Sequence, residues 1–362
     1  MSQSYEFAIK TSAGQYPVKM GVGLERIDFD AENVIFLVDK RVAELHASVL
    51  PSDCIVQEAL ETEKTLRTIE NIIESVRRRG GTRNTRLVSV GGGIIQDIST
   101  FVASCYMRGI DWIYYPTTFL GMVDSCIGGK SSLNAGTFKN IIGNFYPPKQ
   151  IFIDGVFCST LNLTQKIDGL FEAVKISFAH STESLNEYFR INSENAFLDD
   201  NQKLIELAHH SLLRKKFFIE EDEFDRGIRL NLNFGHTFAH AFEGASNYRI
   251  SHGIAVGLGM LAAIIMSRKL KLLTSEEKST AALELHILEL LKLVPDIKKH
   301  LMDLDENLAF KYMESDKKHS SDHFKFILVH KGGVLNLVQL PRSENYKSII
   351  LETIARLKES TN

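Results

Sequence analysis

The pattern of apolar and polar positions differs between the two halves of the chain. In the first half, short apolar runs typical of buried strands alternate with segments of helical periodicity, such as the charged amphipathic stretch 64–79. This alternation predicts parallel strands joined by crossover helices. We therefore expect an open α/β sheet, with strands at residues 33–39, 86–90, 112–115 and 150–154.

After about residue 161 the pattern changes to long helical stretches, at residues 203–218, 276–293 and 348–358. The most apolar segment, 254–266, is shorter than the roughly 18 residues that cross a bilayer, so it predicts a buried helix. A chain of 362 residues favours two domains over a single core. We place an α/β domain at residues 1–160 and an all-α domain at residues 161–362.

Composition and charge exclude several classes of function. With 44% apolar and 24% charged residues, the chain is typical of a globular enzyme. A net charge of -3 gives no support for a nucleic-acid partner, and the apolar segments indicate no membrane partner. The four cysteines are widely spaced without a CxxC pair, and the N-terminus shows no secretory pattern. We therefore expect free thiols and a cytoplasmic location.

A glycine-rich turn follows the predicted strand at residues 86–90. Gly91, Gly92 and Gly93 precede a helix-compatible run, and the backbone N–H groups at such a helix start suit a phosphate group. The spacing is not GxGxxG, so a plain tight turn is the alternative. Asp39, at the end of the first strand, is placed either for a ribose hydroxyl or as a helix N-cap.

Three histidines lie close together in the sequence: His236, His240 and His252. If their segment is helical, His236 and His240 share one face, and the cluster then indicates a metal site. A structural role is the alternative for each histidine alone. Thr237 follows the first histidine directly, so the glutamate of a HExxH protease is missing. Glu172 is one of many carboxylates that qualify as a further ligand, and spacing does not choose among them.

A third cluster combines glycines with cationic side chains. Asp124 opens the segment DSCIGGK, which ends in Lys130, and Lys139 and Asn140 follow. Glycines beside lysines suit a phosphate or carboxylate ligand, and an ordinary surface loop is the alternative. The later cations Lys215, Lys216, Arg226 and Arg229 would by spacing alone form a solvated helix face.

Taken together, these segments resemble 3-dehydroquinate synthase and its relatives, the sugar phosphate cyclases. The resemblance is carried, in order, by GGGIIQD, YMRGI, PTTFLGMVDSCIGGKSSLN, FKNIIGNFYPP, GLFEAVK, EEDEFDRGIRLNLNFGHTFAHAFE, SHGIAVGLGM and a late DKK, from about residue 60 to 330. It implies an N-terminal NAD-binding α/β domain, a C-terminal helical metal-binding domain and a homodimer.

The resemblance also implies roles for individual residues. The zinc ligands, with cobalt as the alternative metal, would be Glu172, His236 and His252, so that His240 faces the substrate instead of the ion. The substrate contacts would be Asp124, Lys130, Lys139, Asn140, Lys175, Lys215, Arg229, Asn233, His240 and one of Lys317 or Lys318, of which we favour Lys318, with Arg108 reaching the phosphate across the dimer interface. The NAD contacts would be Asp39, Glu61, Lys64, Gly92, Gly93, Asp97, Thr117, Thr118, Lys130 and Lys139.

The implied reaction converts 3-deoxy-D-arabino-heptulosonate 7-phosphate into 3-dehydroquinate and phosphate. NAD is reduced transiently, phosphate is eliminated, the hydride is returned and an intramolecular aldol step closes the ring. In this scheme Arg229, with Asn233 and His240, favours a substrate that carries a carboxylate.

Three departures from the family pattern keep other substrates open. They are Gln96 after the glycine turn, the pair Ser131-Ser132, and Ile254 after His-Gly. The alternatives are another sugar phosphate cyclase, acting on sedoheptulose 7-phosphate or an amino sugar, and a metal-dependent polyol dehydrogenase that would release NADH.

Overall fold

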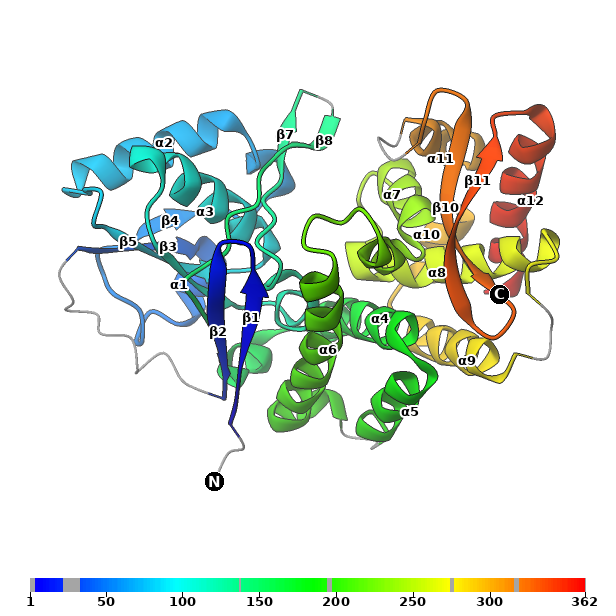
Figure 1. Cartoon of the computed structure of the whole chain (residues 1–362), viewed down its shortest axis with the longest axis horizontal. Coiled ribbons are helices and arrows are strands. Elements are labelled where there is room, and N and C mark those ends of the chain that lie inside the picture. The colour runs from blue at the N-terminus through cyan, green and yellow to red at the C-terminus, as the bar shows by residue number, and fades with distance from the viewer. Residues whose placement is uncertain are drawn as a thin grey trace. The chain divides into compact units, whose positions relative to one another are not determined.

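The computed structural model of the chain describes residues 4–21, 33–136, 138–193, 197–273, 277–315 and 319–361. Contacts within the chain group it into two compact units. The first unit comprises residues 1–161 and 194–223, and the second comprises residues 162–193 and 224–362. Figure 1 labels most of the helices and strands of both units.

The first unit is built on a seven-stranded sheet with the strand order β1-β2-β9-β6-β5-β3-β4. β1 and β2 form an antiparallel hairpin, and the other neighbouring pairs are parallel. The strands are β1 (Tyr5–Thr11), β2 (Gly14–Met20), β3 (Val34–Asp39), β4 (Ile55–Gln57), β5 (Arg86–Gly91), β6 (Trp112–Pro116) and β9 (Gln150–Ile153). β3 and β5 are buried almost throughout, as expected for parallel strands whose two faces are both covered.

Helices connect these strands, and a small hairpin projects beyond the sheet. The elements are α1 (Lys40–Leu45), α2 (Leu66–Arg78), α3 (Gly93–Cys105), α6 (Asn201–Glu221), β7 (Leu133–Ala135) and β8 (Phe138–Ile142). β4 pairs with one side of β3, whereas β5 pairs with its other side. Such a reversal of strand order is the place where an open α/β sheet binds its ligand, outside the carboxyl ends of the strands.

The helix α6 belongs to the first unit although it lies far along the chain. The backbone N–H groups of Lys10 and Ser12, on the β1–β2 hairpin, donate to Glu220 Oε1 at 2.8 Å and to Glu223 Oε2 at 2.7 Å. Near the middle of the helix, the ring of His209 stacks on a tyrosine of β1 at 4.0 Å between centroids. The domain limits at residues 1–160 and 161–362 stay a prediction. They differ from the grouping by contacts at α6, which that grouping assigns to the first unit.

The second unit is helical and is organised around α8. Its helices are α4 (Leu163–His180), α5 (Thr182–Ile191), α7 (His236–Ala245), α8 (His252–Lys269), α9 (Lys278–Lys292), α10 (Ile297–Met302), α11 (Glu306–Glu314) and α12 (Glu344–Ser360). Every residue of α8 from Gly253 to Ser267 is buried, because α4, α7, α12 and the strand β10 (His323–His330) pack around it. An apolar character on all sides is typical of such a central helix.

The observed architecture confirms the predicted fold class and adds to it. The predicted strands correspond to β3, β5, β6 and β9, and the apolar run at 254–266 is the buried helix α8. The second unit also contains a two-stranded antiparallel hairpin, β10 (His323–His330) and β11 (Val334–Pro341), which the expectation of an all-α domain did not include. Within the described residues, no helix is long and apolar enough to cross a membrane.

A buried pair in the second unit links stability to pH. Tyr188 Oη, on α5, lies 2.9 Å from His286 Nε2 on α9, and a neutral imidazole accepts this hydrogen bond. Burial lowers the pKa of His286 from 6.5 to about 4. Because the folded-state pKa lies below the unfolded value, the contribution to stability is complete above pH 6.5 and is lost as the pH falls towards 4.

We therefore expect the free energy of unfolding to fall by about 2 kcal/mol between about pH 7 and pH 5 through this histidine alone. The measurement is denaturant unfolding of the protein and of His286→Gln at both pH values. The variant should lack this part of the pH dependence, and an identical pH dependence in the two proteins would contradict the assignment.

Candidate active site

The carboxyl ends of three neighbouring strands lie at one edge of the sheet in the first unit. β3 ends at Asp39, β5 ends at Gly91 and β6 is followed by Thr117, whose N–H donates to Gly91 O at 3.0 Å. The Asp39 carboxylate caps α1 by accepting from Arg41 N at 2.7 Å, and it also lines an open groove of about 360 Å³. Asp39 therefore acts as the N-cap of α1, and the groove leaves room beside its carboxylate for a polar ligand.

The glycine turn is packed tightly against the segment after β6. Gly92 stands at the N-cap of α3, and a Cβ atom there would lie 2.8 Å from Thr118 Cγ2. The Thr118 hydroxyl accepts from Gly121 N at 3.1 Å, which holds that segment in place. The first backbone N–H groups of α3 and the positive end of its dipole suit an anionic group at this edge.

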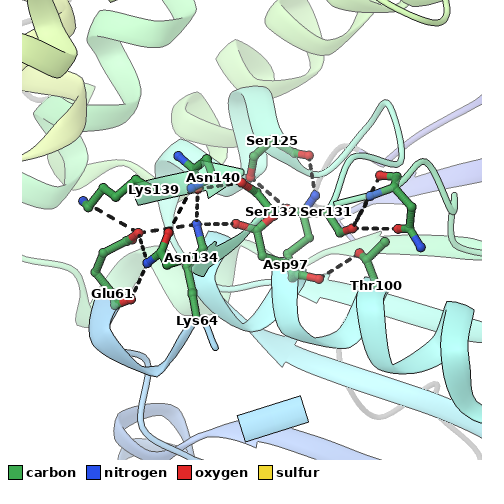
Figure 2. Close-up of polar contacts among 12 residues, drawn as sticks. Glu61, Lys64, Asp97, Thr100, Ser125, Ser131, Ser132, Asn134, Lys139 and Asn140 are labelled. Atoms are coloured by element: carbon green, nitrogen blue, oxygen red, sulfur yellow. Dashed lines mark hydrogen bonds and ion pairs between the residues drawn. The ribbon is translucent and has the colours of Figure 1, made fainter. Parts of the chain in front are cut away.

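Five of the residues implied by the resemblance meet beside this turn, as Figure 2 shows: Glu61, Lys64, Asp97, Lys139 and Asn140. Lys64, only 5% exposed, bonds to Asp97 Oδ2 and to Asn140 Oδ1, each at 2.8 Å. Glu61 Oε1 lies 3.6 Å from both Lys64 Nζ and Lys139 Nζ. The predicted contacts to NAD and to substrate are therefore parts of one network.

Electrostatics in this network are set by burial. Burial raises the pKa of Asp97 to about 6, although the ammonium group of Lys64 opposes this shift. Asn140 adopts a left-handed backbone conformation, with φ of 54°, which turns its amide oxygen towards Lys64 and Ser132 Oγ, at 2.8 and 2.6 Å. These two hydrogen bonds offset the cost of the left-handed backbone conformation of Asn140, as is common at functional sites.

A second group of polar side chains lies at a π-helical turn, Gly121–Ser125. Lys215, on α6 and 7% exposed, donates to both the carbonyl and the carboxylate of Asp124 at 2.6 Å. Gln96, one of the departures from the family pattern, is buried and pairs with Ser125 through two hydrogen bonds of 2.7 and 2.9 Å. The spacing argument assigned Lys215 to a solvated face, and that reading is wrong because α6 packs against this turn.

Two further cations of the first unit are exposed. Lys130 is exposed, with its ammonium 5.9 Å from the centroid of the Phe145 ring. Arg108 is exposed at the far end of α3, about 20 Å along that helix from the glycine turn at 1.5 Å per residue. Met107, Arg108 and Gly109 all have positive φ, a strained sequence that turns the chain sharply there.

In the second unit, glycines bring three helices close enough for their polar side chains to meet. A Cβ atom at Gly259 of α8 would lie 2.2 Å from the carbonyl oxygen of Gly235, and one at Gly257 would lie 2.6 Å from the Phe171 ring of α4. Gly235 itself has a φ of 80° and starts α7. Helix α8 therefore meets the start of α7 at backbone contact and packs its backbone against the Phe171 ring of α4, which larger side chains would prevent.

This approach gathers Glu172, His236 and His252 into a cluster whose potential ligand atoms all lie within 4.8 Å of one another. Glu172 is fully buried on α4, and its Oε1 lies 3.6 Å from His236 Nε2 and 3.3 Å from His252 Nε2. Lys175 Nζ makes an ion pair with the other oxygen. Within the described chain, neither oxygen has a hydrogen bond of good geometry, so a buried anion faces two imidazole nitrogens.

The outer nitrogens of both imidazoles also face acceptors. His252 Nδ1 lies 3.3 Å from Glu243 Oε2, and His236 Nδ1 lies 3.3 Å from the carbonyl oxygen of Phe234. Burial opposes a charge on His252, but Glu243 and Glu172 together raise its pKa to about 10. Acceptors at Nδ1 orient each imidazole with its Nε2 towards Glu172, as in a metal site, and two carboxylates stabilise positive charge at this place.

Sequence reasoning missed Glu243. Its signal was its position on α7, one helical turn after His240 and two turns after His236, in the segment HTFAHAFE. A carboxylate on the same face as a candidate ligand is the usual partner of a metal-bound imidazole.

Of the remaining predicted residues of the second unit, His240 lies at this cluster. The ring of His240 lies 5.7 Å from that of His236 and 6.2 Å from that of His252, between centroids. Arg229 is 3% exposed in the turn Ile228–Asn233, and Asn233 Nδ2 donates to the carbonyl of Leu230 at 3.2 Å. The predicted contact at Lys317 or Lys318 lies outside the described residues.

Comparison with solved structures shows that the chain has the fold of sugar phosphate cyclases. A 2-deoxy-scyllo-inosose synthase, complexed with carbaglucose-6-phosphate, NAD+ and Co2+, superposes with a TM-score of 0.83 at 25% identity and covers 97% of this chain and 100% of its own. A 2-epi-5-epi-valiolone synthase from Streptomyces hygroscopicus, with NAD+ and Zn2+ bound, has a TM-score of 0.78 at 22% identity, over 94% of this chain and 97% of its own, and shows the shared fold.

The chain belongs to the 3-dehydroquinate synthase family. The family models for the N-terminal and C-terminal parts of 3-dehydroquinate synthase match residues 54–168 and 169–319. The 3-dehydroquinate synthase of Campylobacter curvus is 36% identical over 84% of this chain and 87% of its own length. That of Campylobacter concisus is 32% identical over 97% and 98%.

The buried pair of Lys64 and Asp97 supports a test by substitution. Lys64→Met would leave the Asp97 carboxylate buried without its cation, so its pKa should rise above the present value of about 6. We expect a loss of about 3 kcal/mol in unfolding free energy at about pH 8, and a smaller loss at about pH 5, where the carboxylate takes up a proton.

The matched control is Lys139→Met. Lys139 contacts Glu61 at 3.6 Å with a third of its side chain exposed, so its loss should cost under about 1 kcal/mol at either pH. Chemical denaturation of the three proteins at both pH values measures the effect. A cost for Lys64→Met that does not change with pH would contradict the pairing.

Proposed function

We propose that this chain is a 3-dehydroquinate synthase that converts 3-deoxy-D-arabino-heptulosonate 7-phosphate into 3-dehydroquinate and phosphate. Family membership supports a phosphate-eliminating cyclase. The observation that carries the proposal is the buried cluster of Glu172, His236 and His252 on the fold of cyclases whose structures hold NAD+ with Co2+ or Zn2+.

A divalent ion fits the cluster by its donor set. One carboxylate and two imidazoles are the ligands of many catalytic zinc sites, which leave a position open for substrate. The buried carboxylate of Glu172 lacks good hydrogen bonds, and acceptors lie at both outer imidazole nitrogens. We assign Zn2+, with Co2+ as the alternative, to Glu172, His236 and His252, and we assign His240 to the substrate.

NAD fits the carboxyl edge of the sheet in the first unit. Gly92 and Gly93 at the start of α3 suit the diphosphate, and Asp39 suits a ribose hydroxyl. The further contacts we assign are Glu61, Lys64, Asp97, Thr117, Thr118, Lys130 and Lys139. When bound, NAD accepts and returns a hydride, while the metal ion polarises the reacting alcohol.

The protein's own side chains orient and neutralise an anionic substrate. The cations and amides that we assign to this role are Lys130, Lys139, Asn140, Lys175, Lys215, Arg229 and Asn233, with Lys318 and the carboxylate of Asp124. Buried Arg229 presents a planar guanidinium that pairs with a carboxylate through two hydrogen bonds. Lys215, held by Asp124, supplies a fixed positive charge for the phosphate.

We propose further that the active form is a cytoplasmic homodimer. Arg108 is exposed and remote from the glycine turn of its own chain, so its charge is available to a phosphate bound by a second copy. The four cysteines are free thiols, as a reducing compartment maintains them.

The test is an assay of the purified protein with NAD, Zn2+ and the seven-carbon keto acid phosphate, in which phosphate release and NADH absorbance are followed together. We expect phosphate release without accumulation of NADH. Sedoheptulose 7-phosphate serves as a parallel substrate. Turnover of that sugar alone would assign the chain to a sister cyclase, and stoichiometric NADH release would contradict the cyclase mechanism.

The carboxylate assignment is tested by Arg229→Lys. Lysine keeps the charge but not the two parallel hydrogen bonds, so kcat/KM for the keto acid phosphate should fall about tenfold or more. Arg226→Lys, at an exposed position of the same segment, is the matched control and should retain wild-type kinetics. Equal effects of the two substitutions would contradict the role of Arg229.

A further inference from the structure

The N-terminus of α8 is capped by another helix. Ser251 occupies the N-cap position, but its side chain makes no capping bond to its own helix. Its hydroxyl donates instead to Asp168 Oδ1, on α4, at 2.7 Å. The same oxygen accepts from the backbone N–H of Ile254 at 3.0 Å. Asp168 therefore provides across the helix interface the acceptor that Ser251 would normally provide within α8.

Backbone contact reinforces this connection. A Cβ atom at Gly253 would lie 2.2 Å from the carbonyl oxygen of Asp168, so the first turn of α8 lies directly on the backbone of α4 at this residue. The bonds of Ser251 and Ile254 to Asp168 thus fix the chain before and after the two residues that lie between them. His252 is the first residue of α8 and lies between Ser251 and Gly253.

The geometry of the metal cluster depends on the same contact. Asp168 and Glu172 are four residues apart on α4 and share one face of that helix. Asp168 holds the start of α8, and Glu172 Oε1 lies 3.3 Å from His252 Nε2. Because the first turn of a helix is otherwise free to fray, the distance between Glu172 and His252 is set by how firmly Asp168 holds that turn.

We propose that Asp168 is a positioning residue for the metal centre. By capping α8 it sets the place of His252, so that one divalent ion binds Glu172, His236 and His252 together. This inference rests on the metal site of the proposed function. It concerns a residue that touches neither the ion nor the substrate, and its effect is on metal affinity.

The experiment measures the Zn2+ dissociation constant of the full-length protein by competition with a chromophoric chelator. Asp168→Ala removes the acceptor, and Asp168→Asn keeps an oxygen that accepts both bonds. The matched control is Asp305→Ala, because Asp305 caps α11, a helix that carries none of the three cluster residues, through bonds from Asn307 N and Leu308 N at 2.8 and 3.1 Å.

We expect Asp168→Ala to weaken Zn2+ binding by about 10- to 100-fold, the range found for residues that hold metal ligands in place. Asp168→Asn should remain within about threefold of wild type, and Asp305→Ala should match wild type. Both alanine variants should lower the melting temperature, because both lose a helix cap, and only Asp168→Ala should also lose metal affinity.

Two results would overturn the inference while leaving the metal site intact. One is wild-type Zn2+ affinity in a destabilised Asp168→Ala protein, which would make the residue purely structural. The other is an equal loss in Asp168→Asn, which would assign the effect to charge instead of position. If the wild-type protein does not bind Zn2+, the metal site of the proposed function fails and this inference fails with it.

Discussion

The structure of the second unit depends on the burial of one carboxylate, that of Glu172. An ionised carboxylate removed from water is costly unless cations or hydrogen bonds surround it. Lys175 contacts one oxygen, and two imidazoles approach the other. Removal of a single partner would leave an uncompensated charge, so the helices that carry these groups must stay in register. A divalent ion satisfies this arrangement more completely than protons on the histidines do.

In the first unit, the buried charge that needs partners is positive instead of negative. Lys64 is a buried cation, held by a carboxylate and an amide oxygen. Both units thus keep charged groups out of water and pair them with groups of the opposite charge. Such sites are already arranged for an anionic ligand or a metal ion before either binds, and this lowers the cost of reorganisation during the reaction.

Much of the fold could be predicted from the sequence, because strand and helix periodicities are local. The strands β3, β5, β6 and β9 and the buried helix α8 were predicted within a few residues, whereas β2 and β4 were not predicted. The β10–β11 hairpin was missed although each of its strands has eight residues, because it follows a long helical region. The return of α6 to the first unit was also missed, because pairing between residues such as Lys10 and Glu220 has no signal in sequence spacing.

The candidate site was only partly accessible to the same reasoning. Spacing alone paired His236 with His240, because residues four apart share a helix face. The structure instead gathers His236 and His252, on two helices, with Glu172 on a third. Such a cluster depends on glycine contacts between helices, which no local pattern encodes. The resemblance to the family supplied this triad, and it did not identify Glu243 or Asp168.

The most direct test of the account is a crystal structure of the protein grown with Zn2+, with diffraction data collected on both sides of the zinc absorption edge. The account predicts one strong anomalous peak bound by Glu172, His236 and His252 at about 2.0–2.2 Å, with His240 outside its coordination sphere. A peak held by His236 and His240, or none at this cluster in a fully loaded crystal, would contradict it.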